Sequence, residues 1–397
     1  MSSKLLTIGP KLNLGDIFGD SIFNPRLSYS HNPWFCDEYD ILDYLTGPPL
    51  IISGDELIHC SSATTSRRGI ELIEYAGINV AKSIKTYNSK DQYYLNLKEF
   101  KYQKKLVVQH VHPRSEISRE NCWVSPELLS FLNNKSNLDE IVPKKYIPKR
   151  AIVSKAEFVQ LKKELKNNLP LVIKIGTRLS TGGGDDVKIC FEAKDIDEAI
   201  KYFGNTNETI IIEEFLNIKN NFCIQYIIDK KGNISFLGAG EQIIKDGFYA
   251  GNWLNISDVP REAVLVGKTI SDFAYRKGYT GVVGYDVAVT LEDQIFIFDL
   301  NFRLNGSTIP LLIMDDVLSY YNKSAIEFCS LSSVGNYDEM IDTLKTSVDK
   351  GDFVPISTYD PQLSEAKGSP RVQGLLLGEG QDVLTDLRAD LKTKGIK

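Results

Sequence analysis

The stretch from Gly284 to Ser307, GYDVAVTLEDQIFIFDLNFRLNGS, decides the fold of this chain. Its two apolar runs predict a β-hairpin with Asp286 and Asp299 at the ends of the strands. Because strand side chains alternate between two faces, Asp299, Asn301 and Arg303 share one face if the second strand continues. Carboxylate and amide oxygens suit Mg²⁺, which proteins usually hold with one or two carboxylates and phosphate oxygens. A fixed arginine beside them suits a further anion. The stretch therefore predicts a nucleoside triphosphate site rather than a metal cage made of protein alone.

The composition is that of a soluble globular protein. The 397 residues suffice for two or three domains, and 42% hydrophobic with 25% charged residues is ordinary. A net charge of −6 and a pI near 5.5 give no electrostatic case for nucleic acid or anionic membrane as partners. The six cysteines form no CxxC pair, and neither a signal peptide nor a membrane-length apolar run is evident. We expect a cytoplasmic protein with reduced thiols.

Strand and helix patterns alternate in the first third of the chain. Short apolar runs at 50–53 and 105–111 predict strands of a buried sheet, and a helix at 65–76 is expected to end before a glycine. Further on, 324–331 favours a helix. The segment 241–258 is rich in aromatic and amide side chains.

Lys174 lies within the apolar run LVIKIG, where a buried ammonium needs a counter-charge. No acidic residue lies near it in the sequence, so a phosphate is the natural partner. The phrase TGGG, made of Thr181, Gly182, Gly183 and Gly184, follows shortly, and glycines let backbone N–H groups approach phosphate closely. The two features predict a phosphate clamp. A lysine at the edge of a strand, followed by an ordinary turn, explains the same sequence pattern equally well.

Two further segments become informative only when they are considered together with the other motifs. IIIEEFL ends a predicted strand with Glu213 and Glu214, one of which can accept a hydrogen bond from the amine of adenine. A solvated strand end is the simpler interpretation of the same acids. Lys135, in FLNNKSNLDE, is by itself a surface lysine.

The chain has only four histidines, at 31, 59, 110 and 112, so few residues are available for a mechanism that depends on histidine. His110 and His112 alternate in the phrase QHVHPR and could form a metal pair, but a structural role is the better interpretation of both. No Ser/His/Asp triad or cysteine nucleophile is needed for the chemistry below.

Together these segments resemble the ATP-grasp superfamily. Both lysines, the glycine loop, EEFL, the first acid and DLNFR occur in its order and spacing over about 125–310, and FDLNFRLNGS is the most specific part. The N-terminal domain and LLSFLNNKSNLDEIVP further resemble the pre-ATP-grasp domain of the subgroup that includes the pheganomycin peptide ligase. GLLLGEGQDVLTDLRADL is similar to the C-terminal domain of that subgroup.

The resemblance implies an α/β (α+β) chain with the ATP-grasp fold. It implies a pre-ATP-grasp α/β domain at 1–124 and a nucleotide-binding region at 125–330, whose small central lid spans about 151–215. A C-terminal subdomain at 331–397 completes the core. Variable loops build the substrate pockets of this superfamily, and the resemblance implies that 241–258 is such a loop.

The resemblance also implies how a nucleotide would be held. Lys135 and Lys174 would contact the α- and β-phosphates. Glu213 would accept from the adenine amine and Leu216 would offer its backbone to the ring, while Asn221 falls where many members contact ribose or phosphate.

For the metal and the reaction, the resemblance assigns Asp286, Asp299 and Asn301 to Mg²⁺, with Mn²⁺ as an alternative, and Arg303 to the acyl phosphate. The chain departs from the pattern in two places. The glycine loop continues with the acids 185–186 where many members have a basic residue, so these acids are not expected to touch the nucleotide. Asp286 stands where a longer glutamate is common.

The implied activity is that of an ATP-dependent carboxylate–amine ligase in small-molecule or peptide natural-product biosynthesis. It would pass through an acyl phosphate and release ADP and phosphate. A ligase that loads an amino acid onto the thiol of a carrier protein is the alternative. The intact Lys174, Asp299, Asn301 and Arg303 argue against a decayed, non-catalytic ATP-binding module. The substrates would be a small carboxylate and an amine, and a carrier protein or a second copy of the chain stays open as a partner.

Overall fold

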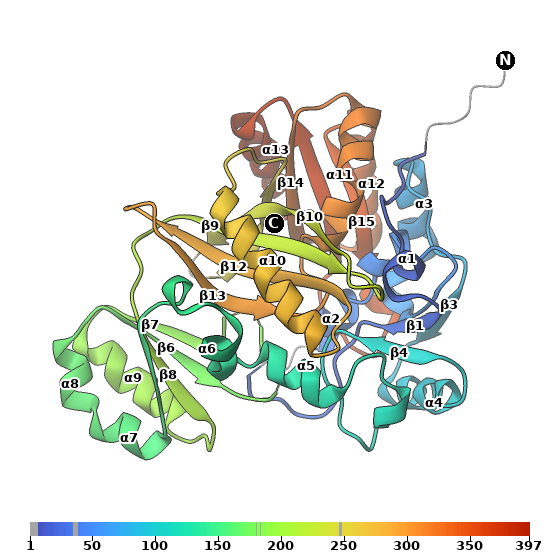
Figure 1. Ribbon diagram of the computed structural model, residues 1–397. Coiled ribbons are helices and arrows are strands. Elements are labelled where there is room, and N and C mark those ends of the chain that lie inside the picture. Colours follow the sequence, from blue (N-terminus) through green and yellow to red (C-terminus); the bar gives the residue numbers. More distant parts are fainter. Residues whose placement is uncertain (1–6, 35–38, 180, 183, 246–247) are drawn as a thin grey trace.

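The computed structural model describes residues 7–34, 39–179, 181–182, 184–245 and 248–397. The described residues form three β-sheets flanked by helices (Figure 1). In Figure 1 the N-terminal sheet lies beside the largest sheet, and the smallest sheet projects at the opposite side.

The N-terminal sheet is parallel, with strand order β3-β2-β1-β4. Its strands are β1 (Ser21–Asn24), β2 (Leu57–Ser61), β3 (Ile84–Tyr87) and β4 (Lys105–Val108). The helices of this part are α1 (Leu14–Phe18), α2 (Tyr39–Tyr44), α3 (Arg67–Tyr75) and α4 (Lys90–Phe100). The carboxyl ends of parallel strands meet at one edge of a sheet, where ligands of α/β proteins commonly bind. The segment after β4 begins at such an end.

The eight-stranded sheet runs β13-β12-β9-β10-β11-β14-β16-β15, and each adjacent pair is antiparallel. Its strands are β9 (Ile218–Ile228), β10 (Ile234–Lys245), β11 (Phe248–Leu254), β12 (Gly281–Thr290), β13 (Ile295–Asn301), β14 (Ala325–Ser332), β15 (Phe353–Tyr359) and β16 (Arg371–Gly378). The helices of this part are α10 (Arg261–Arg276), α11 (Thr308–Tyr321), α12 (Tyr337–Asp349) and α13 (Gln381–Thr393).

The smallest sheet is antiparallel, with order β5-β8-β6-β7. Its strands are β5 (Arg150–Val153), β6 (Leu171–Gly176), β7 (Val187–Cys190) and β8 (Thr209–Glu214), and its helices are α7 (Lys155–Gln160), α8 (Lys162–Asn167) and α9 (Ala193–Phe203). Helix α7 begins at a capping box, in which Ser154 and Glu157 each bond the backbone of the other. Helices α5 (Pro126–Asn133) and α6 (Leu138–Ile141) connect the N-terminal sheet to this one.

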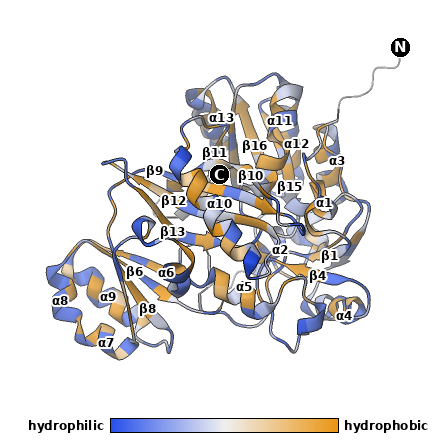
Figure 2. Ribbon diagram, viewed as in Figure 1, coloured by the Kyte–Doolittle hydropathy of each residue, from blue (hydrophilic) through white to orange (hydrophobic). Residues whose placement is uncertain are grey.

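Amphipathic helices cover the smallest sheet. Helix α9 buries Ile196, Ala199 and Phe203, whose spacing places them on one face of the helix. Figure 2 shows the alternation of hydrophobic and hydrophilic residues along α7, α8 and α9. Trp34, from the N-terminal part, packs its ring 5.9 Å from that of Phe203 and joins the core of this sheet. The smallest sheet is therefore tied to the N-terminal part of the chain.

One hydrophobic core runs from the N-terminal sheet into the C-terminal strands. Ile58 of β2, Leu344 of α12 and Leu376 of β16 belong to the same cluster of buried side chains. Burial of so large an apolar surface fixes the N-terminal sheet against the eight-stranded one. A second cluster lies between α10 and the strands β9, β12 and β13.

Three local predictions were wrong. The run at 50–53 belongs to a 3₁₀ helix, Pro48–Ile51, because two prolines at its start lack the N–H that a sheet ladder needs. The segment 324–331 is strand β14, buried between β11 and β16, where a short apolar run cannot be told from a helix by its pattern. Within 241–258, the described residues are mostly the paired strands β10 and β11.

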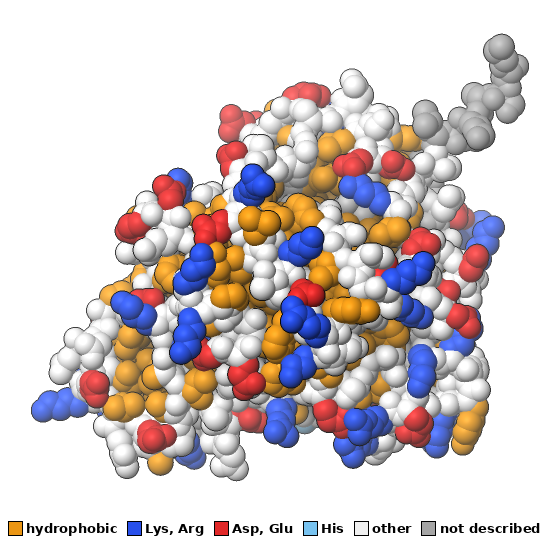
Figure 3. Space-filling model, in the orientation of Figure 1, with side chains coloured by type: hydrophobic (Ala, Val, Ile, Leu, Met, Phe, Trp, Pro, Cys, Tyr) orange, Lys and Arg blue, Asp and Glu red, His pale blue; other side chains and the backbone are white. Residues whose placement is uncertain are grey.

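The surface shows no single-sign charge patch on the face in Figure 3, where acidic and basic side chains are interspersed. Among the described residues, no helix has the length and apolar character needed to cross a membrane.

A buried ion pair organises the polar interior beside the N-terminal sheet. The Arg26 Nε donates to the Asp43 carboxylate over 2.6 Å, and each residue is 1% exposed. The same carboxylate accepts from the hydroxyls of Tyr87 and Ser364. Since Ser364 lies between the last two strands of the eight-stranded sheet, Asp43 ties the two sheets together.

We predict that Asp43→Ala lowers the free energy of unfolding by about 3–5 kcal/mol, because it leaves the Arg26 charge buried without a partner. The unfolding transition in urea measures this. As a control, Glu71→Gln removes the acid of the exposed pair with Arg67 and should leave the midpoint unchanged. Equal midpoints for the wild type and Asp43→Ala would contradict the prediction.

Candidate active site

The predicted hairpin is confirmed, and it places two acids opposite each other. Asp286 of β12 pairs directly with Asp299 of β13, so both carboxylates lie on the same face of the sheet. The pairing shifts by one residue immediately after Asp286. Asn301 ends β13 and its amide approaches the Asp286 carboxylate at 3.5 Å. Arg303 lies two residues beyond the end of the strand, in a turn rather than on the ladder.

Asp286 is held by hydrogen bonds from the neighbouring strands. The Gln242 amide donates to it over 2.8 Å, and Asn221 donates in turn to Gln242 over 3.0 Å. Burial and the negative charge of Asp299 raise the pKa of Asp286 to about 7. Two adjacent carboxylates that repel each other, with an amide oxygen beside them, are a donor set that fits a divalent cation such as Mg²⁺. Within the described residues, no cluster of three or more His, Cys, Asp or Glu side chains could hold a metal by itself.

Lys135 reaches these acids from outside the hairpin. It begins the 3₁₀ turn Lys135–Asn137, and its side chain is 10% exposed. Its Nζ lies 3.0 Å from Asp299, 2.9 Å from Asp186 and 3.2 Å from the Thr181 hydroxyl. The lysine that looked like a surface residue in the sequence is thus a buried cation between the hairpin and the glycine loop.

Arg303 faces the same cleft. Its guanidinium donates to the Asn133 side chain over 3.2 Å, and the same Asn133 oxygen accepts from the backbone N–H of Phe302. Burial lowers the pKa of Arg303, and the charges of Asp299 and Asp286 offset part of this effect. The guanidinium stays charged, since an arginine does not lose its proton in proteins.

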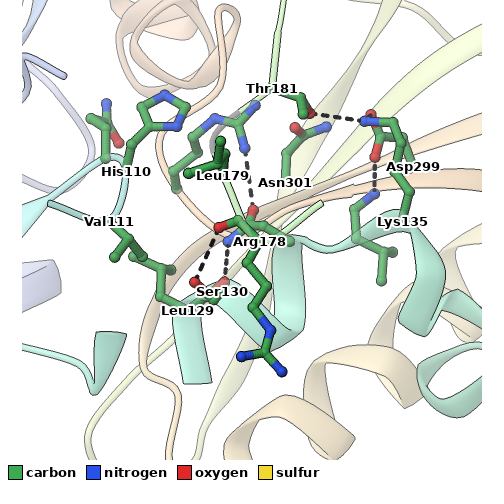
Figure 4. A pocket seen from close by; sticks show the side chains of 14 residues that line it. His110, Val111, Leu129, Ser130, Lys135, Arg178, Leu179, Thr181, Asp299 and Asn301 are labelled. Atoms are coloured by element: carbon green, nitrogen blue, oxygen red, sulfur yellow. Dashed lines mark hydrogen bonds and ion pairs between the residues drawn. The ribbon is translucent and has the colours of Figure 1, made fainter. Parts of the chain in front are cut away.

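Around these groups lies a cleft that opens to solvent. Figure 4 shows its lining, with Lys135 and Asp299 at one end and His110 at the other. The lining side chains come from the segment after β4, from helix α5 and the turn after it, from the glycine loop and from the hairpin. They are Gln109, His110, Val111, Leu129, Ser130, Asn133, Lys135, Arg178, Leu179, Thr181, Asp299, Leu300, Asn301 and Arg303.

Lys174 has a protein counter-charge, contrary to the sequence prediction. Its Nζ lies 2.5 Å from the carboxylate of Glu213 on the adjacent strand β8, and Arg150 approaches the same carboxylate at 3.6 Å. Lys174 is 5% and Glu213 3% exposed. The partner was missed because it is distant in sequence and becomes a neighbour only when β6 and β8 pair. Lys174 also donates to the Phe298 carbonyl over 3.3 Å. Because Phe298 belongs to β13, this hydrogen bond joins β6 of the smallest sheet to the hairpin.

The glycine loop is described in part. Thr181, Gly182 and Gly184 are described, whereas Gly183 lies outside the described residues. Gly184 has φ +94°, which an L side chain rarely adopts, so a glycine is needed there. Asp186, expected to stay away from the nucleotide site, is 2% exposed and paired with Lys135. The carboxylate therefore points into the region where phosphates were predicted to bind.

The predicted adenine and ribose contacts lie along β8 and the segment after it. Glu214 accepts from the Lys149 backbone N–H over 2.7 Å. Leu216 lies in the short segment between β8 and β9. Asn221 lies on β9, and its side-chain oxygen is buried without a hydrogen-bond partner.

Three residues near the site were not predicted as site residues. His110 follows a strand that ends at Val108, so it and His112 do not form a pair on one strand face. Gln242 lies on β10, two strands away from β12, and nothing in its own segment links it to Asp286. Asn133 is the last residue of helix α5, shortly before the 3₁₀ turn Lys135–Asn137. In the sequence, only its amide side chain and its proximity to Lys135 indicated a role in the site.

Cysteine chemistry has no place in the site. The described cysteines, 60, 122, 190, 223 and 329, are all free, and Cys36 lies outside the described residues. Burial and the charge of Asp286 raise the pKa of Cys223 well above its usual range. That thiol stays protonated and is a poor nucleophile.

Comparison with known proteins identifies the class. A family model described as "L-aspartate--L-methionine ligase, ATP grasp" matches residues 148–301, and the model of the N-terminal domain of this ligase matches residues 13–130. The chain is an ATP-grasp carbon–nitrogen ligase. Neither of these family models names the pheganomycin peptide ligase.

Solved structures confirm the ATP-grasp fold. The ADP complex of N5-carboxyaminoimidazole ribonucleotide synthetase (PurK) has a TM-score of 0.61 at 14% identity and covers 95% of this chain and 97% of that one. Biotin carboxylase from Campylobacter jejuni has a TM-score of 0.56 at 12% identity, covering 95% and 91%. The N5-carboxyaminoimidazole synthetase from Staphylococcus aureus complexed with ADP has a TM-score of 0.55 at 12% identity, covering 98% and 99%. At these identities the likeness shows the fold alone.

We predict that the acid pair makes the stability of this ligase depend on pH. The folded pKa of Asp286, about 7, lies above its ordinary value of 3.8, so the folded protein binds a proton that the unfolded chain releases. The bound proton contributes its full share to the free energy of unfolding below about pH 4. This contribution falls as the pH rises and is lost above about pH 7, which lowers the free energy of unfolding by up to about 4 kcal/mol. Asp286→Asn removes this loss.

Urea unfolding without divalent cations at pH 5 and pH 8 tests this prediction. The difference in unfolding free energy between the two pH values should be smaller in Asp286→Asn than in the wild type. An equal pH dependence in both proteins would contradict it.

Proposed function

We propose that this ligase joins the carboxylate of L-aspartate to the amine of L-methionine, with ATP as the energy source. The observation that carries the proposal is the convergence of Asp299, Asn301, Lys135 and Arg303 in one cleft, with Asp286 directly opposite Asp299. The matching family models supply the two substrates by name. The resemblance to the pheganomycin peptide ligase subgroup favours the same bond type, an amide between amino-acid units.

The nucleotide would enter between the smallest sheet and the hairpin. Lys135 and Lys174 would contact its phosphates, and Thr181 with the neighbouring glycines would close over them. Glu213 or Glu214 and the Leu216 backbone would face the adenine, and Asn221 the ribose. The neighbours solved with ATP or ADP support a nucleotide in a fold of this kind.

Lys135 would exchange partners when the nucleotide binds. It is now neutralised by Asp186 and Asp299, which stand where phosphate oxygens would lie. Asp286, Asp299 and Asn301 would hold Mg²⁺, and with Asp299 among the ligands the Lys135 ammonium would be available to the phosphates. The cation would neutralise charge on the transferred phosphoryl group.

The first chemical step would transfer the terminal phosphoryl group. An oxygen of the substrate carboxylate attacks the γ-phosphorus, the bond to the β-phosphate oxygen breaks, and ADP leaves with the electron pair. Arg303 lies beside Asn301 and Asp299, where its guanidinium can bind the developing acyl phosphate in two places. The amine then attacks the acyl carbon, and phosphate leaves.

A carrier-protein thiol in place of the amine is the second candidate acceptor. The family models favour the amine, because their name joins two amino acids. We place the reaction in the cytoplasm, in small-molecule or peptide biosynthesis.

We predict that L-aspartate and L-methionine together, with Mg-ATP, produce a dipeptide, ADP and phosphate in equal amounts. Chromatography of the nucleotides and mass spectrometry of the products measure this. AMP in place of ADP would reject the acyl-phosphate route. Turnover only with a phosphopantetheinyl carrier protein, and none with free amines, would assign the thiol alternative.

We predict that Lys174→Ala weakens nucleotide binding about 10- to 100-fold, as expected for the loss of a charge-assisted hydrogen bond to phosphate. Turnover should nearly vanish. Calorimetry with a non-hydrolysable ATP analogue and Mg²⁺ measures the affinity.

Lys188→Ala is the matched control, because it removes an exposed lysine from the adjacent strand of the same sheet. It should leave the affinity unchanged. If Lys174→Ala also bound the analogue with wild-type affinity, Lys174 would serve only the buried pair with Glu213.

A further inference from the structure

We propose that His110 is the general base that takes the proton from the amine as it attacks the acyl phosphate. The inference rests on the proposed function, and it assigns a catalytic residue to its second step. It starts from the position of His110 in the cleft that holds Arg303, Asn301 and Asp299.

Hydrogen bonds join the segments on either side of His110. The preceding residue, Gln109, accepts from the backbone N–H of Leu304 over 2.9 Å and so joins the end of β4 to the turn that carries Arg303. Asn133 of helix α5 fixes the same turn from the other side. These bonds position the segment that carries His110 against the turn that carries Arg303, as a site built on a rigid scaffold requires.

His110 lies at the end of the cleft opposite to the nucleotide. Figure 4 shows it across the cleft from Lys135 and Asp299, where the phosphates and the metal would bind. Arg303 lines the same cleft and contributes to the charge around the ring. An acyl phosphate bound by Arg303 would keep its phosphoryl group toward Lys135 and leave its carbonyl open to an amine from the side of His110.

The surroundings keep the imidazole neutral in the unliganded cleft. Burial, the charge of Arg303 and the proximity of His112 lower the pKa of His110 well below its usual range. The other charged groups of the described lining are Lys135, Arg178 and Asp299. An anionic acyl phosphate beside Arg303 would reduce the positive potential and raise the basicity of the ring when it is needed.

The other titratable residues of the described lining suit the role of a neutral base less well by their chemistry. Lys135 is a cation paired with the carboxylate of Asp299, and the guanidinium groups of Arg178 and Arg303 have no lone pair that could accept a proton. An imidazole is the side chain of this lining that acts as a neutral base.

The proton balance of the step suits such a base. The neutral amine adds to the acyl carbon, and the adduct carries an N–H bond on a positively charged nitrogen. That nitrogen is more acidic than a free ammonium, so a weak base can deprotonate it. His110 takes this proton, the carbonyl re-forms, and the C–O bond to phosphate breaks with its electron pair on the phosphate. His110 then releases the proton to the departing phosphate or to water.

The other histidine of the same phrase has a structural role. His112 is 5% exposed, and its ring nitrogens contact Glu116 at 3.0 Å and the Arg26 carbonyl at 3.1 Å. It offers a matched variant, since both rings lie in one six-residue phrase and only one lines the cleft.

A hydroxylamine trap separates the two chemical steps. Hydroxylamine is uncharged at neutral pH and attacks an acyl phosphate without help from a base, so it reports formation of the intermediate. We expect His110→Gln to form aspartyl hydroxamate at a rate close to that of the wild type. Dipeptide formation with methionine should fall about 10²- to 10⁴-fold, the usual contribution of a general base.

Two further variants serve as controls for this assignment. Imidazole added to His110→Ala should restore part of the dipeptide formation and leave hydroxamate formation unchanged. His112→Gln should lower the unfolding temperature and reduce both reactions in parallel, because it disturbs the fold.

Three results would overturn the assignment. Equal losses of hydroxamate and dipeptide in both His110 variants would mean that His110 binds the acid or supports the fold. Unchanged dipeptide formation would remove any role in the second step. If the wild type forms no hydroxamate, the acyl-phosphate function fails first, and the assignment of His110 falls with it; hydroxamate from the wild type with unaffected variants would reject His110 alone.

Discussion

The structure depends on the balance of charge between two strands. Asp286 and Asp299 stand directly opposite each other on β12 and β13, and their mutual repulsion raises the pKa of Asp286. Antiparallel pairing does not normally place like charges opposite each other, because such a pair is destabilising. Lys135 relieves part of this cost by pairing with Asp299. The two carboxylates are also a donor set that fits a divalent cation, whose charge would reduce their repulsion further.

The same balance explains why the cleft needs three separate parts of the chain. Lys135 belongs to a 3₁₀ turn after helix α5, Asp186 to the end of the glycine loop, and the acids to the eight-stranded sheet. Each ion pair therefore joins two parts of the chain. The end of the glycine loop is thus held against the 3₁₀ turn by the Lys135 ammonium. The sequence had suggested that Asp186 stays away from this region, because an acid is unfavourable beside phosphate.

Local pattern predicted the hairpin, and distance in sequence explains what it missed. The hairpin was evident because alternation, the turn and both acids fall within one short stretch. Glu213 is as close to Lys174 as an ion pair allows, yet nothing in either segment reveals that β6 and β8 are neighbours. The burial of Lys135 was likewise invisible, since only the folded chain brings the hairpin over its turn. The misassigned strand β14 shows the same limit, because a central strand buried on both faces has no alternation to detect.

The segment QHVHPR places its two histidines in different surroundings because strand β4 ends before it. Had β4 continued through it, both histidines would have faced the same side, as a metal pair requires. The strand stops at Val108, and the chain then follows the turn after β13, to which Gln109 is bonded. His110 is left on the cleft side, while His112 reaches the interior beside Arg26 and Glu116. The N-terminal sheet thus contributes to the cleft through the loop at the carboxyl end of one strand, the place where parallel sheets carry their chemistry. Since one continuous core fixes that sheet against the hairpin, the position of His110 relative to Arg303 is set by the packing of the whole molecule.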